Sequence, residues 1–129
     1  MKILLDTHVF LWALLTPERL SDEAVELLAD GSYEKYLSAA SAWEIICKYA
    51  DGKIVLPVGP EEFVTKSLLA SGILSLPLTV QDALVAGELP SYHDDAVDRQ
   101  LVAQALRNQM FIMTDDSAFE MYEVKIIDI

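Results

Sequence analysis

Five short apolar runs divide the chain into regular units. They are KILL (2–5), KYLS (35–38), ILSL (73–76), FIMT (111–114) and KIID (125–128). Each run has the length of a β-strand. Between the runs, apolar residues recur every three or four positions, as in Val97, Leu101, Val102 and Ala105, which is typical of a helix that packs one face against a core. Strands that alternate with helices predict a parallel sheet.

Residues that favour helix ends support these boundaries. Ser21 precedes an acidic turn and Gly31 follows the same predicted helix, as expected for an N-terminal and a C-terminal cap. Pro60 opens another helix, with acids in its first turn. The Pro- and Gly-containing segment 56–60 is too short to link two domains. We therefore predict a single domain over residues 1–129.

The composition is that of a globular protein. Hydrophobic residues make up 53% and charged residues 23% of 129 residues, which excludes disorder and fibrous repeats. The single cysteine, Cys47, can form no internal disulfide, so we expect a reducing, cytoplasmic setting. The apolar run Val9–Leu15 is far shorter than the ~20 residues that a membrane helix needs. Asp6 and His8 interrupt the N-terminal stretch that would otherwise imitate an export signal.

The chain is strongly acidic. Nine Lys and Arg residues stand against 21 Asp and Glu residues, which gives a formal charge of −12. Such a charge repels nucleic acid at long range and argues against general nucleic-acid coating. Any nucleic-acid contact is therefore expected to be local and assisted by metal ions.

Carboxylates follow two of the predicted strands. Asp6 ends the first apolar run, and Asp115 and Asp116 come directly after the fourth run and Thr114. In open α/β sheets, ligands bind beyond the carboxyl ends of the strands. If these two strands are parallel, the acids share one edge of the sheet.

Two further acids lie on predicted helices. Asp98 is in line with the apolar residues Leu101 and Val102 of its own helix, so its side chain should point inward. A buried, isolated carboxylate destabilises a protein by several kcal/mol unless a cation or hydrogen-bond donors compensate. Glu44 lies one turn after Ser41, near the end of the second run. It can face the same edge of the sheet.

Each acid also has a simpler structural explanation. Asp6 can cap the helix that follows it, and Asp115 or Asp116 can cap a short helix around residues 118–119. Glu44 can pair with Lys48, and Asp95 with Arg99, at the i,i+4 spacing, while the helix dipole alone favours Asp94 and Asp95. The coincidence of four acids at equivalent places in the fold favours a shared site.

A site built of carboxylates indicates divalent cations. Clustered carboxylates repel one another unless cations occupy the cluster. Oxygen ligands select magnesium, manganese or calcium over zinc, and the isolated His8 and His93 offer no zinc-binding spacing. Two such ions about 4 Å apart can activate a water and stabilise the leaving oxygen of a phosphodiester.

Four segments together resemble one known family. They are ILLDTHVFLWALL (3–15), LSAASAWEIICK (37–48), HDDAVDRQLVAQAL (93–106) and FIMTDDSAFEMY (111–122). In this order they resemble the PIN-domain family, and most closely the VapC-like ribonuclease toxins of type II toxin–antitoxin pairs. The resemblance spans nearly the whole chain. It implies a three-layer α/β/α sandwich with a central parallel sheet of about five strands, and an Mg²⁺- or Mn²⁺-dependent endoribonuclease.

The resemblance also assigns roles to residues. It implies that four acids are catalytic and bind the metal, with Asp95 as an additional metal ligand: Asp6, Glu44, Asp98 and Asp116. It favours Asp116 over Asp115 because Phe119 follows at the usual spacing. The polar residues expected to support the site are Thr7, Ser41, Thr114 and Arg99. Ala96 and Val97 replace the proline and phenylalanine of close relatives, and Asp94 replaces a basic residue, which bears on substrate affinity.

The expected partners follow from the same resemblance. They are an RNA substrate and a small antitoxin whose C-terminal segment covers the acidic groove, often through a basic side chain. The high apolar content, with Trp12 and Trp43, leads us to expect a homodimer and no membrane role. The alternative is a PIN-like module that uses its acids to bind a basic peptide without turnover. Phosphoryl transfer through Asp6 is disfavoured because the second acid of such phosphatases, two residues on, is missing.

Overall fold

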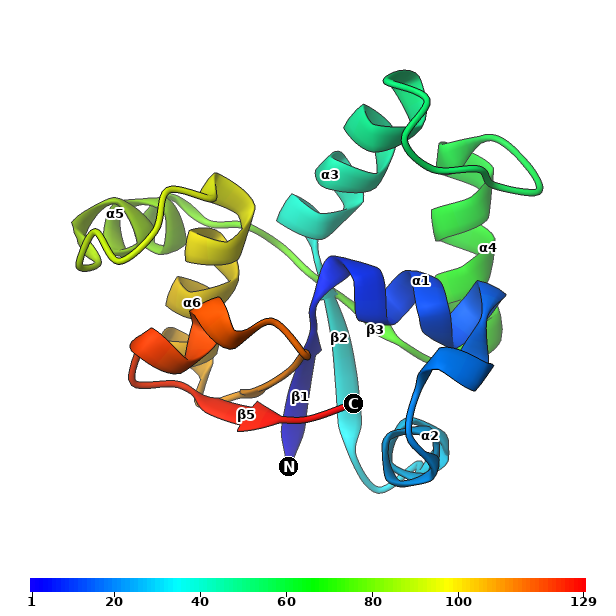
Figure 1. The fold of residues 1–129 in the computed structure, drawn as a ribbon, viewed down its shortest axis with the longest axis horizontal. Coiled ribbons are helices and arrows are strands. Elements are labelled where there is room, and N and C mark those ends of the chain that lie inside the picture. Colours follow the sequence, from blue (N-terminus) through cyan, green and yellow to red (C-terminus); the bar gives the residue numbers. More distant parts are fainter.

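The structure, a computed structural model, describes residues 1–129 (Figure 1). Its single sheet has the strands β1 (Lys2–Leu5), β2 (Glu34–Ser38), β3 (Leu74–Leu76), β4 (Phe111–Met113) and β5 (Lys125–Ile127). The strand order is β3-β2-β1-β4-β5, and all neighbouring pairs are parallel. Each strand falls on one of the five apolar runs, so the predicted parallel sheet of about five strands is confirmed.

Six α-helices connect and cover the strands. They are α1 (Thr7–Leu15), α2 (Asp22–Ala29), α3 (Ala39–Ala50), α4 (Pro60–Ser71), α5 (Val80–Glu88) and α6 (Ala96–Asn108), with short 3-10 helices at η1 (Pro17–Arg19) and η2 (Ser117–Met121). The side chain of Ser21 caps α2, and Pro60 is the first residue of α4, both as predicted. No helix combines the length and the apolar character needed to cross a membrane.

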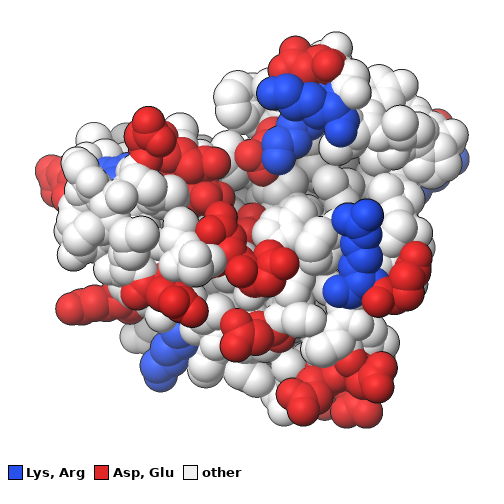
Figure 2. All heavy atoms as spheres, in the orientation of Figure 1, with Lys and Arg blue, Asp and Glu red and all other residues white.

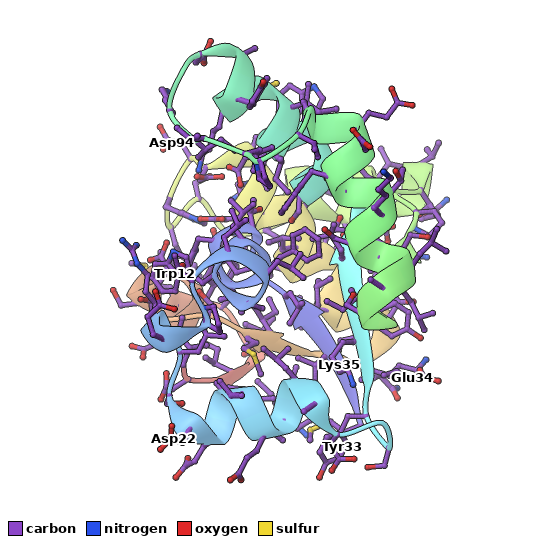
Figure 3. All side chains as sticks on the ribbon, turned by 90° about the vertical axis from the view of Figure 1, so that its right-hand side faces the viewer. Trp12, Asp22, Tyr33, Glu34, Lys35 and Asp94 are labelled. Atoms are coloured by element: carbon purple, nitrogen blue, oxygen red, sulfur yellow. The ribbon has the colours of Figure 1, made fainter.

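The sheet lies between two hydrophobic layers. Ile3 and Leu5 of β1 pack on one face in a cluster with residues of α1, α2 and α4, whereas Leu4 packs on the other face with α6 and η2. Figures 1 and 3 show α1, α2 and α4 together on one side of the sheet, with α6 on the other. This alternation follows from the strand period of two, and it confirms the predicted three-layer sandwich.

The carboxyl ends of β1 and β4 meet at one edge. Leu5 of β1 is paired with Met113 of β4, and the backbone N–H of Asp6 donates to the carbonyl of Met113 at 3.1 Å. The helices α1 and α3 and the short helix η2 begin directly beyond β1, β2 and β4. This edge therefore gathers helix N-termini and the residues that cap them.

Candidate active site

Asp6 lies buried at the centre of this edge. Its Oδ1 accepts a hydrogen bond from the backbone N–H of Thr7 at 2.7 Å, and its Oδ2 accepts one from the hydroxyl of Thr114 at 2.7 Å. Burial raises the pKa of Asp6, and the nearby charge of Glu44 raises it further, although His8 and the hydrogen bonds from Thr114 and Thr7 oppose this. Asp6 caps α1, as the structural alternative predicted, and it is also part of an acidic cluster.

Buried hydroxyl groups surround Asp6. The hydroxyl of Thr114, besides donating to Asp6, accepts from the backbone N–H of Asp116 at 3.0 Å. Thr7 donates to the hydroxyl of Ser41 at 2.9 Å and thereby joins α1 to α3. Thr7, Ser41 and Thr114 are all buried. The three hydroxyl groups hold β1, β4 and α3 in a fixed relation around one carboxylate.

Asp98 has the most perturbed carboxyl group in the protein. It lies on α6 and is only 9% exposed, which confirms that its side chain points inward. Burial raises the pKa of Asp98 to about 8, and the charges of Asp6, Asp95, Asp116 and Glu44 contribute in that order. Its nearest polar partner on a basic residue is His93, whose Nε2 lies 3.4 Å from Oδ2. Asp98 thus faces other acids without a lysine or arginine to pair with it.

The remaining acids lie in the middle of one helix and at the starts of two others. Glu44 is half-buried on α3, and its carboxylate lies 3.8 Å from Nζ of Lys48. Asp116 and Asp95 are exposed. Asp116 caps η2 and Asp95 caps α6, each by accepting a backbone N–H. The same side chains therefore have the simpler structural roles, helix capping and pairing with a lysine, and can also belong to a shared acidic site.

The predicted acids converge at one place on the surface. Figure 2 shows acidic side chains gathered on the face between α1 and α6, with basic side chains set apart from them, one group over the end of α3 and others at the right and lower left of the view. The electrostatic effect of four acids on Asp98 reflects this proximity. As the side chains are placed, no three His, Cys, Asp or Glu residues form a group that could hold a metal ion. Metal binding by these residues stays a prediction.

Comparison with known proteins identifies the family. The family model of the PIN domain matches residues 3–125. This chain belongs to the PIN domain family. Among curated proteins, none matches its sequence.

Solved structures share the fold of this PIN domain over nearly its full length. One similar structure is VapBC2 from Rickettsia felis bound to a DNA fragment from their promoter, with a TM-score of 0.71, 16% identity, and coverage of 99% of this chain and 98% of that one. DNA-bound VapBC from Salmonella typhimurium also has a TM-score of 0.71, with 19% identity and the same coverage. FitAcB from Neisseria gonorrhoeae has a TM-score of 0.64, 25% identity, and coverage of 97% and 96%.

Two histidines of this PIN domain lie at the acidic edge, although their spacing had suggested that they were isolated. His8 bridges two acids, with Nε2 2.7 Å from Asp115 and Nδ1 3.3 Å from Asp6. His93 contacts Asp98 and also the hydroxyl of Tyr122, at 2.7 Å. The only signal in the sequence was that each histidine stands within five residues of an expected site acid. Asp115 is engaged with His8, whereas it is Asp116 whose charge reaches Asp98.

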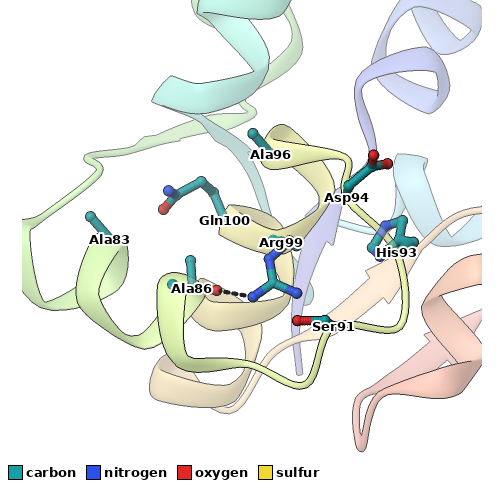
Figure 4. Close-up of a pocket in the computed structure, with 9 residues that line it drawn as sticks. Ala83, Ala86, Ser91, His93, Asp94, Ala96, Arg99 and Gln100 are labelled. Atoms are coloured by element: carbon teal, nitrogen blue, oxygen red, sulfur yellow. Dashed lines mark hydrogen bonds between the residues drawn. The ribbon is translucent and has the colours of Figure 1, made fainter.

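Arg99 of this PIN domain binds the backbone rather than an acid. Its guanidinium donates to the carbonyls of Ala86, Leu89 and Pro90 at 2.8 to 2.9 Å, and Figure 4 shows the first of these bonds. The ion pair with Asp95, which the i,i+4 spacing offered as a structural alternative, is not formed. The end of α5 leaves carbonyl groups without helical partners, and these take up the guanidinium, so that Arg99 joins α6 to α5.

Proposed function

We propose that this PIN domain is a metal-dependent endoribonuclease that acts in the cytoplasm as the toxin of a type II toxin–antitoxin pair. The observation that carries the proposal is Asp98, a buried carboxylate whose pKa is raised to about 8 among four neighbouring acids. Such an arrangement lowers the stability of the fold when no cation is bound. Carboxyl groups with strongly shifted pKa values are concentrated at functional sites.

The donor set fits Mg²⁺ or Mn²⁺ in kind. Asp6, Glu44, Asp98 and Asp116 would hold the ion, with Asp95 as an additional oxygen donor, because hard divalent cations prefer carboxylate oxygens. Glu44 is half-buried and Asp116 is exposed, and both side chains would turn toward Asp98 to complete the site. When bound, the ion would activate a water and stabilise the leaving oxygen of a phosphodiester.

The chain's own residues would orient this chemistry. The hydroxyl of Thr114 and the N–H of Thr7 fix both oxygens of Asp6. The bond from Thr7 to Ser41 sets the position of α3, which carries Glu44. Such supporting contacts are needed because ligand groups must be held to within about 0.5 Å of the productive geometry. Thr7, Ser41 and Thr114 are therefore assigned a positioning role.

We also propose an antitoxin partner and a homodimer. The VapBC structures from R. felis and S. typhimurium are described as bound to DNA, the former to a fragment from their promoter. This supports a cognate antitoxin as a partner of the present chain, and we propose that it covers the acidic cluster. Trp43, which is 63% exposed on α3, supports burial in an assembly.

Cleavage of RNA tests the enzymatic proposal. A panel of single-stranded and hairpin RNAs is incubated with the protein and Mg²⁺, Mn²⁺ or a chelator, and products are resolved by electrophoresis. Wild type should cleave only with metal, whereas Asp6→Asn and Asp98→Asn should lose most activity. Absence of cleavage with every metal, together with variants that behave like wild type in cells, would contradict the proposal.

A second candidate is a binding module without turnover. The formal charge of −12 and the absence of a ready group of three metal-binding side chains favour it. In that case the acids would hold a basic peptide. Calorimetric titration separates the two candidates, since the nuclease should take up Mg²⁺ or Mn²⁺ at micromolar to millimolar concentrations, and Asp98→Asn should weaken that uptake.

A further inference from the structure

A cleft of about 450 Å³ lies between α5, α6 and the loop that joins them (Figure 4). Its volume is within the range of small-ligand sites, about 300–1,000 Å³. The cleft adjoins the acidic edge through His93, which lines it and lies 3.4 Å from the carboxylate of Asp98. A chain bound at Asp98 would therefore meet this cleft directly.

The walls of the cleft suit a flat, uncharged group. On α5 the wall consists of Ala83, Ala86 and Gly87, which leave room for a ring. On α6 it contains Arg99, whose guanidinium is held in place by three carbonyls. Small apolar surfaces and fixed guanidinium planes are surfaces on which unstacked nucleobases pack. Asp94 also lines the cleft, and its negative charge disfavours a phosphate there.

Gln100 supplies an unused hydrogen-bonding group. It points from α6 toward α5 (Figure 4). Its Oε1 is the one buried side-chain nitrogen or oxygen atom in the protein that has no hydrogen-bond partner. Buried polar atoms nearly always form a hydrogen bond, so a buried oxygen without a partner indicates a group that a ligand could satisfy. A carboxamide offers an acceptor beside a donor, and this pair matches the N6 amine and N7 of adenine.

We propose that this cleft binds a nucleobase of the RNA next to the cleaved bond, and that Gln100 recognises it as adenine. This inference rests on the proposed nuclease function and adds a specificity residue to it. Gln100 would turn its carboxamide to the base edge, while Arg99 and the small residues of α5 pack against the ring. The base then holds the neighbouring phosphodiester beside Asp98.

Nucleoside binding to the metal-free protein tests this directly. Adenosine, guanosine, cytidine and uridine are titrated into ¹⁵N-labelled protein, because nucleosides lack the phosphate and need no catalysis. Adenosine should shift the amide signals of Ala86, Gly87 and Gln100 most strongly. Gln100→Leu should weaken adenosine binding about tenfold while raising the Tm, since it removes the unpaired oxygen. The matched control, Gln81→Leu on the exposed side of α5, should leave binding unchanged.

A second variant guards against an indirect effect of Gln100→Leu. Ala83→Leu fills the cleft from an exposed position on α5 and should also abolish the shifts. The inference is overturned if no nucleoside perturbs these signals, or if Gln100→Leu binds all four as wild type does. If the protein cleaves RNA with the expected metal dependence but binds no nucleoside, only the proposal of a nucleobase site in the cleft is wrong. If it binds adenosine but cleaves no RNA, the proposed nuclease function is wrong.

Discussion

At the scale of single residues, the acidic cluster destabilises the folded protein, because its carboxylates are partly buried and repel one another. Asp98 is ionised with difficulty because it is buried and faces Asp6, Asp95, Asp116 and Glu44. Burial also raises the pKa of Asp6, although hydrogen bonds from Thr114 and Thr7 oppose it. The two acids differ in their hydrogen-bond partners. Both carboxylate oxygens of Asp6 accept a hydrogen bond, whereas the carboxylate of Asp98 has only His93 as a hydrogen-bond partner.

Replacing Asp98 by asparagine should stabilise the metal-free protein in a pH-dependent way. Below the usual pKa of 3.8 the carboxyl is protonated in both states, and between 3.8 and about 8 the folded protein keeps a proton that the unfolded chain has lost. Stability therefore falls as pH rises through this range. Thermal melts in chelator should show that the gain in Tm of Asp98→Asn over wild type grows progressively from about pH 4 to about pH 8 and then levels off.

The control for this experiment is Asp128→Asn. Asp128 is exposed, so its replacement should shift the melting temperature little at any pH. Excess Mg²⁺ should reverse the ranking of wild type and Asp98→Asn, because the ion stabilises only the protein that binds it. An Asp98→Asn gain that is the same at every pH would contradict the electrostatic explanation.

Thr114→Val tests the support of Asp6. The substitution keeps the shape of a fully buried side chain but removes the hydroxyl that donates to Asp6 and accepts from the N–H of Asp116. We expect a loss of about 1–3 kcal/mol in the free energy of unfolding and a roughly 10- to 100-fold loss of cleavage. Urea unfolding and RNA cleavage measure the two effects. Thr65→Val, which removes an exposed hydroxyl on α4, should change neither.

At the scale of elements, a polar network fixes the helices that frame the site. Gln104 on α6 is fully buried, accepts from the hydroxyl of Ser38 at 2.5 Å and donates to the carbonyl of Pro77 at 3.1 Å. Ser38 is the N-cap of α3, the helix that carries Glu44.

Asp82 on α5 is the acidic member of the same network. Burial would raise the pKa of Asp82, but hydrogen bonds from Thr79 and Arg107 outweigh the effect of burial and hold the pKa below its usual value. The network links α3, α5 and α6.

Removing one partner of the Asp82–Arg107 ion pair should destabilise the protein more than removing both partners. Arg107→Met leaves the buried Asp82 without its ion-pair partner, and we expect a loss of about 3 kcal/mol in urea unfolding. The double variant Asp82→Leu/Arg107→Met should recover much of that loss. Lys66→Met removes an exposed pair with Glu62 and should cost less than about 1 kcal/mol. Equal losses for Arg107→Met and Lys66→Met would contradict the role of the pair that the buried Asp82 forms with Arg107.

At the scale of the whole molecule, the net charge opposes the proposed substrate. A charge of −12 repels an RNA chain, and the basic side chains on the face that carries the acids lie apart from the central acidic cluster (Figure 2). Steering by a basic surface, which most nucleic-acid-binding proteins use, is therefore weak here. Binding must depend on bound cations and on contacts within the site.

This predicts an unusual salt dependence. As KCl is raised from roughly 0.02 to 0.15 M at saturating Mg²⁺, kcat/KM for RNA cleavage should rise or stay level, because salt screens the repulsion. The double variant Glu23→Gln/Glu26→Gln, on exposed positions of α2, should show a flatter dependence. A steep fall of kcat/KM with salt would show that attraction to phosphates dominates after all.

The local elements and their order along the chain could be predicted from the amino-acid sequence. The apolar runs predicted all five strands, Ser21 and Pro60 predicted helix starts, and the stripe of Leu101 and Val102 predicted that Asp98 is buried. These features depend on residues within one or two turns, whose spacing is visible in the sequence. Alternation of strands and helices then placed Asp6 and Asp116 at one edge.

The contacts between distant side chains could be seen only once the chain was folded. His8 contacts Asp115, which lies 107 positions further along the chain. Arg99 donates to the carbonyls of α5 and the following loop and does not pair with Asp95. The cleft beside Gln100 exists only because α5 packs against α6. Such contacts depend on sheet order and helix packing, which bring distant residues together. Local periodicity gives the face on which a residue lies but carries no information about its partner across the fold.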